Sequence, residues 1–146
     1  MSTLPFFHSA IFKTFPPLPG ALEPRDEFRH KLILCAANDP TGNWYRPLLV
    51  VHDNEIIGNG GFKGPPDVLG RVEIGYTLAP AARGRGFGTE LVRLLIGKAR
   101  TQGAMQLIAH VLPDNAASIR VLEKNGFLPA GEIELGNQRL LRYACH

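Results

Sequence analysis

A strand, a glycine-rich turn and a helix follow one another between residues 72 and 100, and this unit restricts the fold of the chain most. Before the turn, apolar residues alternate with polar ones from Val72 to Leu78, the pattern of a strand with two different faces. After it, apolar residues recur at helical spacing from Leu91 to Ala99. The turn is Arg83-Gly84-Arg85-Gly86-Phe87-Gly88. An α/β fold is therefore expected.

The composition of the turn favours a site for an anion. Glycine allows a positive φ and a close approach of the backbone to a ligand. The N-terminus of the helix that follows offers unpaired N–H groups and the positive end of the helix dipole, which together favour phosphate. Arg83 and Arg85 add two cations that can each donate paired hydrogen bonds to phosphate oxygens. Taken alone, the turn is equally compatible with a solvated connection in which glycine serves only the chain geometry.

The first half of the chain predicts a strand, a helix and a hairpin. A short strand is expected within residues 1–20, and apolar positions at helical spacing predict a helix over residues 24–37. Two apolar runs, 48–52 and 55–62, flank the turn pair Asp53-Asn54, which predicts an antiparallel hairpin. The glycines of the second run indicate a bulge or a close backbone approach.

The second half predicts a parallel strand pair and a second hairpin. A helix that joins strand 72–78 to strand 107–112 implies parallel pairing through a right-handed crossover. Asn115 is a suitable N-cap for a further helix, which Asn125-Gly126 should end. Gly136-Asn137 predicts the turn of the last hairpin. A chain of 146 residues is most simply one domain, spanning residues 1–146.

Charge and cysteine content exclude several classes of partner and site. The net charge is +3, from 16 basic and 13 acidic residues, without the long basic run of a nucleic-acid-binding arm. Cys35 and Cys145 have no metal-ligand spacing, so we expect free thiols and no metal site, although a disulfide stays open. The start of the chain lacks a signal-peptide pattern, and no run of 18 apolar residues occurs. A cytoplasmic protein that binds neither nucleic acid nor membrane is expected.

Two motifs give the chain a family resemblance between residues 72 and 131. The turn contains Arg83-x-x-Gly86-x-Gly88, and residues 115–127 read Asn-Ala-Ala-Ser-Ile-Arg-Val-Leu-Glu-Lys-Asn-Gly-Phe. Both resemble motifs of the GNAT superfamily of N-acetyltransferases. Glu-Ile-Gly-Tyr at residues 73–76 is most similar to the branch that contains the ribosomal-protein N-terminal acetyltransferases.

The resemblance implies a fold, a cosubstrate and a reaction. The fold is a mixed, mostly antiparallel central sheet of about six to seven strands with helices on both faces. The cosubstrate is acetyl-coenzyme A (acetyl-CoA), and its acetyl group moves by direct attack to an amine of a small molecule, peptide or protein. A homodimer is one assembly that the family implies. The implied cofactor-binding residues are Leu78, Arg83, Arg85, Gly86, Phe87, Gly88, Thr89, Asn115 and Ser118.

Particular backbone groups carry this implied binding. The amides of the turn and of the first helical residues would bind the pyrophosphate. Leu78, or a neighbour in its strand, would pair with the pantetheine arm and donate an N–H to the thioester oxygen as charge develops there. Asn115 and Ser118 would contact the cofactor from the other side.

Acetyl transfer also requires a neutral amine, so a base is expected within reach. Glu73 is the first candidate, because it lies on the strand beside the expected thioester site, and an exposed structural carboxylate is its alternative. His110 is the second candidate, and a hydrogen-bonded core histidine is its alternative. Many relatives carry a tyrosine that protonates the leaving thiolate where this chain has Leu122. Tyr76 and Tyr143 are the candidate substitutes.

Two other function classes remain open. A dinucleotide-binding domain is disfavoured, because the glycine spacing and the strands before the turn do not match a Rossmann loop. A non-catalytic module that binds coenzyme A or another phosphate is the main alternative. The acceptor is not determined, and the candidates to line its site are Phe28, Arg29, Trp44, Tyr45 and the strand around Gly60.

Overall fold

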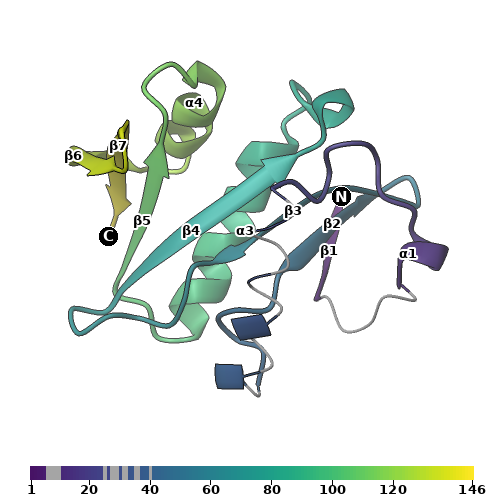
Figure 1. The fold of residues 1–146 in the computed structure, drawn as a ribbon, viewed down its shortest axis with the longest axis horizontal. Helices are drawn as coiled ribbons and strands as arrows, with labels where there is room; N and C mark the ends of the chain where they lie inside the picture. Colours follow the sequence, from purple (N-terminus) through teal and green to yellow (C-terminus); the bar gives the residue numbers. More distant parts are fainter. Residues whose placement is uncertain (6–10, 25, 27–29, 31–32, 35–36, 40) are drawn as a thin grey trace.

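The structure is a computed structural model that describes residues 1–5, 11–24, 26, 30, 33–34, 37–39 and 41–146. Within these residues, seven strands form one sheet in the order β1-β2-β3-β4-β5-β7-β6 (Figure 1). The strands are β1 (Ser2–Pro5), β2 (Leu48–His52), β3 (Glu55–Phe62), β4 (Arg71–Leu78), β5 (Gln106–Val111), β6 (Leu128–Leu135) and β7 (Gln138–Cys145). The helices whose bounds fall within the described residues are α1 (Ile11–Thr14), α3 (Phe87–Thr101) and α4 (Ala116–Lys124), with a 3-10 turn, η1 (Pro80–Ala82).

Strand directions match the expected mixed sheet. Strands β4 and β5 are parallel, and the other neighbouring strands in the sheet are antiparallel. The parallel pair is joined by α3, which confirms the predicted crossover. Both predicted hairpins are present, as β2 with β3 and as β6 with β7.

Local turn chemistry explains the first hairpin and its bulge. Asp53 and Asn54 adopt φ values of 50° and 62°, the left-handed conformation that a two-residue hairpin turn requires. The register of β2 with β3 shifts between Val50, which pairs with Gly58, and Val51, which pairs with Ile56. Strand β3 is therefore bulged beside Gly58. A Cβ on Gly58 would lie 2.3 Å from the carbonyl oxygen of Thr77 in β4. Gly58 therefore permits the close approach of the β3 and β4 backbones that the glycines of this run predict.

Helical segments cover both faces of the sheet. Helix α3 packs Leu91, Val92 and Leu95 onto one face, and α4 adds Leu122 to the same core. On the opposite face, Leu49 and Val51 of β2 meet residues 12–22, including Phe12 of α1. Because neighbouring residues of a strand point to opposite faces, β2 contributes to both cores. The expectation of helices on both faces is confirmed.

Part of the N-terminal prediction lies outside the described residues. The expected opening strand is present as β1, and residues 6–10 are not described. The helix predicted over 24–37 depends on Phe28, Leu32 and Cys35, which all lie outside the described residues. Cys145 is a buried free thiol. No helix in the described part of the chain is long and apolar enough to cross a membrane.

Asp39 organises the loop that precedes β2. Its carboxylate is buried, with 6% exposure, and accepts hydrogen bonds from the Thr41 hydroxyl and from the amides of Asn43, Trp44 and Tyr45. Burial acts to raise the pKa of Asp39, but the four hydrogen bonds outweigh it and hold the pKa below its ordinary value. The folded state therefore favours the ionised carboxylate.

Replacing Asp39 by Ala should lower the free energy of unfolding by about 1–2 kcal/mol, because it leaves part-buried amide donors without their charged acceptor. Since the folded pKa is depressed, this stabilisation is present above the unfolded value of about 3.9 and is lost as pH falls through the folded value. Urea unfolding of wild type and variant between pH 7 and pH 2 checks both points. Stability curves that stay parallel over this range would contradict the assignment.

Candidate active site

Strands β4 and β5 separate partway along their length. They pair from Arg71 to Glu73 on β4, opposite Gln106 to Ile108 on β5. Beyond this point the two strands diverge, and α4 follows β5 on the far side of the opening (Figure 1). We call the space between β4 and α4 beyond Glu73 the gap.

The backbone of β4 presents hydrogen-bonding groups to the gap. The Glu73 carbonyl accepts from Lys63, and the Ala79 amide donates to Ile57, so alternate residues from 73 to 79 bond to β3. In an antiparallel ladder, the residues between them point their N–H and C=O groups to the other side. Tyr76 and Leu78 therefore face the gap with their backbone groups, as expected for a strand that pairs with an extended ligand.

The first cavity at the gap is formed by the glycine-rich turn, and we call it the loop cavity. It has a volume of about 470 Å³. Gly86 is the N-cap of α3 with φ 84°, and no side chain caps the helix. The Glu90 amide is the first to bond back into the helix, to the Gly86 carbonyl at 3.2 Å. The amides that precede Glu90 at the start of α3 are thus positioned to bind an anion.

Most of the predicted cofactor-binding residues line this cavity. They are Leu78, Arg83, Gly86, Gly88, Thr89, Asn115 and Ser118. The Arg83 side chain bridges the turn, because its Nε donates to the Leu78 carbonyl at 3.2 Å. Asn115 caps α4 by accepting from the Ser118 amide at 3.1 Å, as its position predicts.

The side chains of Arg85 and Phe87 point elsewhere. The Arg85 guanidinium lies 4.9 Å from the centre of the Phe87 ring, and this ring lies 4.7 Å from that of His52. Neither residue is part of the lining of the loop cavity. The Arg85 side chain, which was expected to add a second cation to the anion site, therefore lies outside this cavity. Its expected backbone contribution, through the amide, does not depend on the side-chain position.

Gly88 sets the distance between α3 and α4. A Cβ at this position would lie 3.3 Å from Val121 Cγ2 and 3.6 Å from Leu78 Cδ1. Glycine therefore keeps the helix N-terminus open toward the cavity. The uncapped helix end, the left-handed glycine and the nearby cations fit a phosphate-bearing cosubstrate such as acetyl-CoA.

Two cations of the loop cavity were not identified from sequence. Arg120 and Lys124 of α4 line it together with Ala117 and Val121. These four residues follow the i, i+3, i+4, i+7 spacing of one helix face. This spacing was visible in the sequence, but an exposed basic stripe alone does not indicate a ligand.

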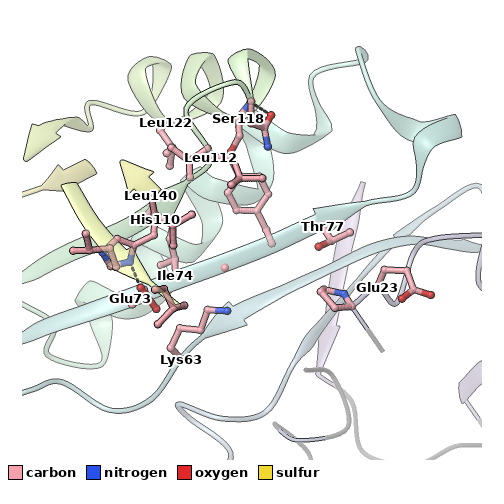
Figure 2. Close-up of a pocket in the computed structure, with 18 of the residues that line it drawn as sticks. Glu23, Lys63, Glu73, Ile74, Thr77, His110, Leu112, Ser118, Leu122 and Leu140 are labelled. Carbon is pink, nitrogen blue, oxygen red and sulfur yellow. Dashed lines mark hydrogen bonds and ion pairs between the residues drawn. The ribbon is translucent and has the colours of Figure 1, made fainter. Parts of the chain in front are cut away.

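The second cavity lies on the other side of the gap and has a volume of about 640 Å³; we call it the His110 cavity. Its lining includes both candidate bases, Glu73 and His110 (Figure 2). The His110 Nδ1 and the Glu73 Oε1 are hydrogen-bonded to each other. The two alternatives that the sequence left open thus form one unit.

Arg142 completes this unit from β7, directly opposite His110 in the β5–β7 ladder. Its Nε donates to the His110 Nε2 at 3.1 Å. Arginine can only donate, so Nε2 of a neutral His110 carries the lone pair and Nδ1 carries the proton toward Glu73. Glu73 remains 31% exposed at the cavity and can accept a proton from a bound group.

Tyr76 and Ser118 lie where the two cavities meet. Both residues line both cavities, together with Thr77 and Asn115. The Tyr76 hydroxyl is 2.7 Å from Ser118 Oγ, which joins β4 to α4 across the gap. Burial raises the pKa of Tyr76, and the hydrogen bond with Ser118 opposes this increase.

The other sequence candidates occupy varied positions. Leu122 is buried and contributes to the His110 cavity, whereas Tyr143 is 6% exposed in the core and lines neither cavity. Trp44 packs against Phe62, with ring centres 5.5 Å apart. Among the other suggested acceptor-site residues, Tyr45 lines neither cavity, and Phe28 and Arg29 lie outside the described residues. The strand around Gly60 contributes Asn59 to the His110 cavity, although Gly60 itself lines neither cavity.

Lys63 lines the His110 cavity near Glu73 (Figure 2). Desolvation lowers the pKa of Lys63, while the charge of Glu73 acts to raise it. The cavity therefore holds acidic and basic side chains together.

Known proteins match this chain in sequence and in fold. An N-acetyltransferase of Bacillus subtilis, YjdG, whose function is uncharacterised, is 36% identical over 97 residues, which are 65% of this chain and 58% of YjdG. The chain thus spans less than two thirds of that relative. A ribosomal-protein-alanine N-acetyltransferase from Brucella melitensis has 26% identity and a TM-score of 0.66, covering 82% of this chain and 76% of its own.

A third match bears on the fold alone. The structure of yncA, a putative acetyltransferase from Salmonella typhimurium with its cofactor acetyl-CoA, has 23% identity and a TM-score of 0.67. The match covers 82% of this chain and 73% of the yncA chain.

The sequence model of a protein family, the acetyltransferase (GNAT) domain, matches residues 7–128 of this chain. Sequence, sheet topology and family model agree, and the chain belongs to the GNAT acetyltransferase family.

Proposed function

We propose that this protein is an N-acetyltransferase that uses acetyl-CoA to acetylate an amine by direct attack in a ternary complex. The observation that carries the proposal is the meeting of two different cavities at the gap. One presents an open helix N-terminus and cations, and the other presents the Glu73–His110 pair. A donor that bears phosphates suits the first cavity, and an amine that must lose a proton suits the second.

The loop cavity would hold acetyl-CoA, which supplies an activated acetyl group. The amides of Gly86, Gly88 and Thr89 would bind the pyrophosphate, with Arg83 and the cations of α4 nearby. The backbone of Leu78 or Tyr76 faces the gap and would donate an N–H to the thioester oxygen. This group would stabilise the negative charge that develops during attack.

The His110 cavity would hold the acceptor. Glu73 would take a proton from the incoming amine, because a free alkylamine is mostly protonated at neutral pH. His110 would orient the carboxylate through Nδ1–H, and Arg142 would fix the ring from the other side. The acceptor is an amine-bearing small molecule or a peptide.

The proposal also covers the domain organisation, the location and the assembly of the protein. We infer one acetyltransferase domain over residues 1–146, located in the cytoplasm, with a homodimer as the assembly to test by light scattering. The proposal includes no metal, nucleic-acid or membrane partner.

The test is thiol release from acetyl-CoA in the presence of a panel of amines, free amino acids and peptide N-termini. Steady release that depends on one class of amine is expected, with an amine-free reaction as the control. Calorimetric binding of acetyl-CoA without turnover across the panel would favour a non-catalytic binding module. Binding that collapses with salt and extends to RNA would favour a phosphate-backbone partner.

Replacing both Arg120 and Lys124 by Ala should weaken acetyl-CoA binding about tenfold, because exposed ion pairs contribute up to about 1 kcal/mol each. The loss should shrink as salt increases, because screening weakens the same contacts in the wild type. Calorimetry at two salt concentrations measures both effects. The matched control is Arg93→Ala with Lys98→Ala, two exposed cations of α3 outside the loop cavity. Equal losses in the two double variants would rule out a specific role for the α4 cations.

A further inference from the structure

The phenol of Tyr76 is placed at the junction of the two cavities. The residue sits on β4, where the backbone faces the gap, and its hydroxyl reaches Ser118 of α4 at 2.7 Å. It lines both the loop cavity and the His110 cavity. Under the proposed function, on which this inference rests, the donor thioester and the acceptor amine meet at the same place.

The reaction requires a proton at this junction. When the amine nitrogen bonds to the acetyl carbon and the C–S bond breaks, the sulfur leaves with the electron pair as a thiolate. Leu122, on the α4 wall of the His110 cavity, has no proton to give. Tyr143 lies in the core and lines neither cavity.

We propose that Tyr76 donates its hydroxyl proton to the departing sulfur of coenzyme A, with Ser118 as the hydrogen-bond partner that orients the phenol. The S–H bond forms as the phenol O–H bond breaks. The phenolate accepts a hydrogen bond from Ser118 and then takes a proton from water. An amine that enters protonated loses two protons: Glu73 takes the first before attack and passes it to solvent, and takes the second as the C–S bond breaks. Glu73 then returns this proton to solvent, so the cycle converts the ammonium group and acetyl-CoA into the amide, the coenzyme A thiol and one released proton.

The environment of the hydroxyl fits a proton donor. Burial raises the pKa of Tyr76, so the phenol stays protonated at neutral pH. A thiol of pKa about 8.5 is a stronger acid than the phenol, so the transfer is uphill even to a full thiolate, and reprotonation of the phenolate by water completes it. We therefore expect the donor to act late, as the C–S bond breaks, and to be most useful for a basic thiolate.

The main test is Tyr76→Phe, which removes only the hydroxyl. We expect kcat with acetyl-CoA to fall about 10- to 100-fold, less than the usual effect of losing a general acid because a thiolate whose thiol has a pKa of about 8.5 leaves readily. The affinity for acetyl-CoA, measured by calorimetry, should change little. The matched control is Tyr143→Phe, which should retain wild-type kcat. A kcat within twofold of wild type for Tyr76→Phe would overturn the proposal.

A leaving-group comparison separates proton donation from a structural role. Two truncated acetyl thioesters are used, one of an alkyl thiol and one of a more acidic aryl thiol. The ratio of wild-type to variant kcat/KM should be large for the alkyl thioester and close to one for the aryl thioester. An equal ratio for both donors would mean that the hydroxyl only positions the site, which overturns the proposal.

Ionisation of the free protein gives a readout without substrate. The difference in tyrosinate absorbance between wild type and Tyr76→Phe should titrate above the ordinary tyrosine value of about 10. Titration at or below that value would contradict a buried, protonated phenol. If the wild type turned over no amine, the proposed function and this inference would both be overturned. If the wild type were active and Tyr76→Phe were equally active, only this inference would be overturned.

Discussion

Replacing Glu73 by Gln should lower kcat about 10²- to 10⁴-fold at neutral pH, the usual contribution of a general base. The amide keeps the size of the side chain and can still accept a hydrogen bond from His110 Nδ1–H, but it cannot take a proton from the amine. The deficit should shrink as pH rises toward the pKa of an alkylamine, about 10.4, because more of the acceptor is then already neutral. A pH profile of kcat for wild type and variant measures both effects.

The control for this substitution is Glu134→Gln, an exposed carboxylate on β6 that lines neither cavity. It should retain wild-type kcat at every pH. If Glu73→Gln lost less than threefold while His110→Gln lost activity, the roles within the pair would be reversed, with His110 as the base and Glu73 as its partner. A full deficit that persists at high pH would instead indicate that Glu73 positions the acceptor.

Replacing Gly86 and Gly88 together by Val should weaken acetyl-CoA binding by at least about 100-fold, equivalent to about 2.7 kcal/mol. Gly86 has φ 84°, a conformation that costs an L-residue about 1–2 kcal/mol, so Val would shift the turn. At Gly88, the nearest atom to an added Cβ is 3.3 Å away on Val121, so the larger side chain would push α4 away or fill the cavity. Both changes displace the amides that are proposed to bind the pyrophosphate.

Calorimetry with acetyl-CoA measures this loss, and the melting temperature shows whether the variant is folded. Gly97→Val is the matched control, because a Cβ at this position of the same helix meets no atom within 4 Å. It should bind as wild type does. A folded Gly86→Val/Gly88→Val variant with unchanged affinity would exclude the turn as the pyrophosphate site.

Features that depend on short-range chemistry could be predicted from the sequence. The turn pair Asp53-Asn54, the cap Asn115 and the helix stop at Gly126 each determine a local conformation, and the structure has all three. The parallel β4–β5 pair followed from a helix between two strands. The family resemblance supplied the number of strands and the two-sided covering of the sheet.

Features that depend on register between distant strands could not be predicted. Glu73, His110 and Arg142 come from three strands, and their contact requires both the parallel register of β4 with β5 and the antiparallel register of β5 with β7. Period-two patterns give the face of a side chain but not its partner across the sheet. The sequence therefore presented Glu73 and His110 as alternatives, and gave no indication of Arg142.

The contact between Tyr76 and Ser118 is a further case of this kind. It spans the gap between β4 and α4, which no local pattern describes. The side-chain directions of Arg85 and Phe87 were also beyond sequence reasoning, because they depend on packing against His52 of β2. In each case the missing information was the arrangement of neighbouring elements in space.

The most direct test of the account is an experimental structure of the protein bound to acetyl-CoA. We expect pyrophosphate oxygens within hydrogen-bonding distance of the Gly86, Gly88 and Thr89 amides, and the thioester in the gap beside Tyr76. The acetyl carbon should then be open to the His110 cavity. A pyrophosphate bound away from the N-terminus of α3, or a thioester that cannot be reached from the His110 cavity, would contradict it.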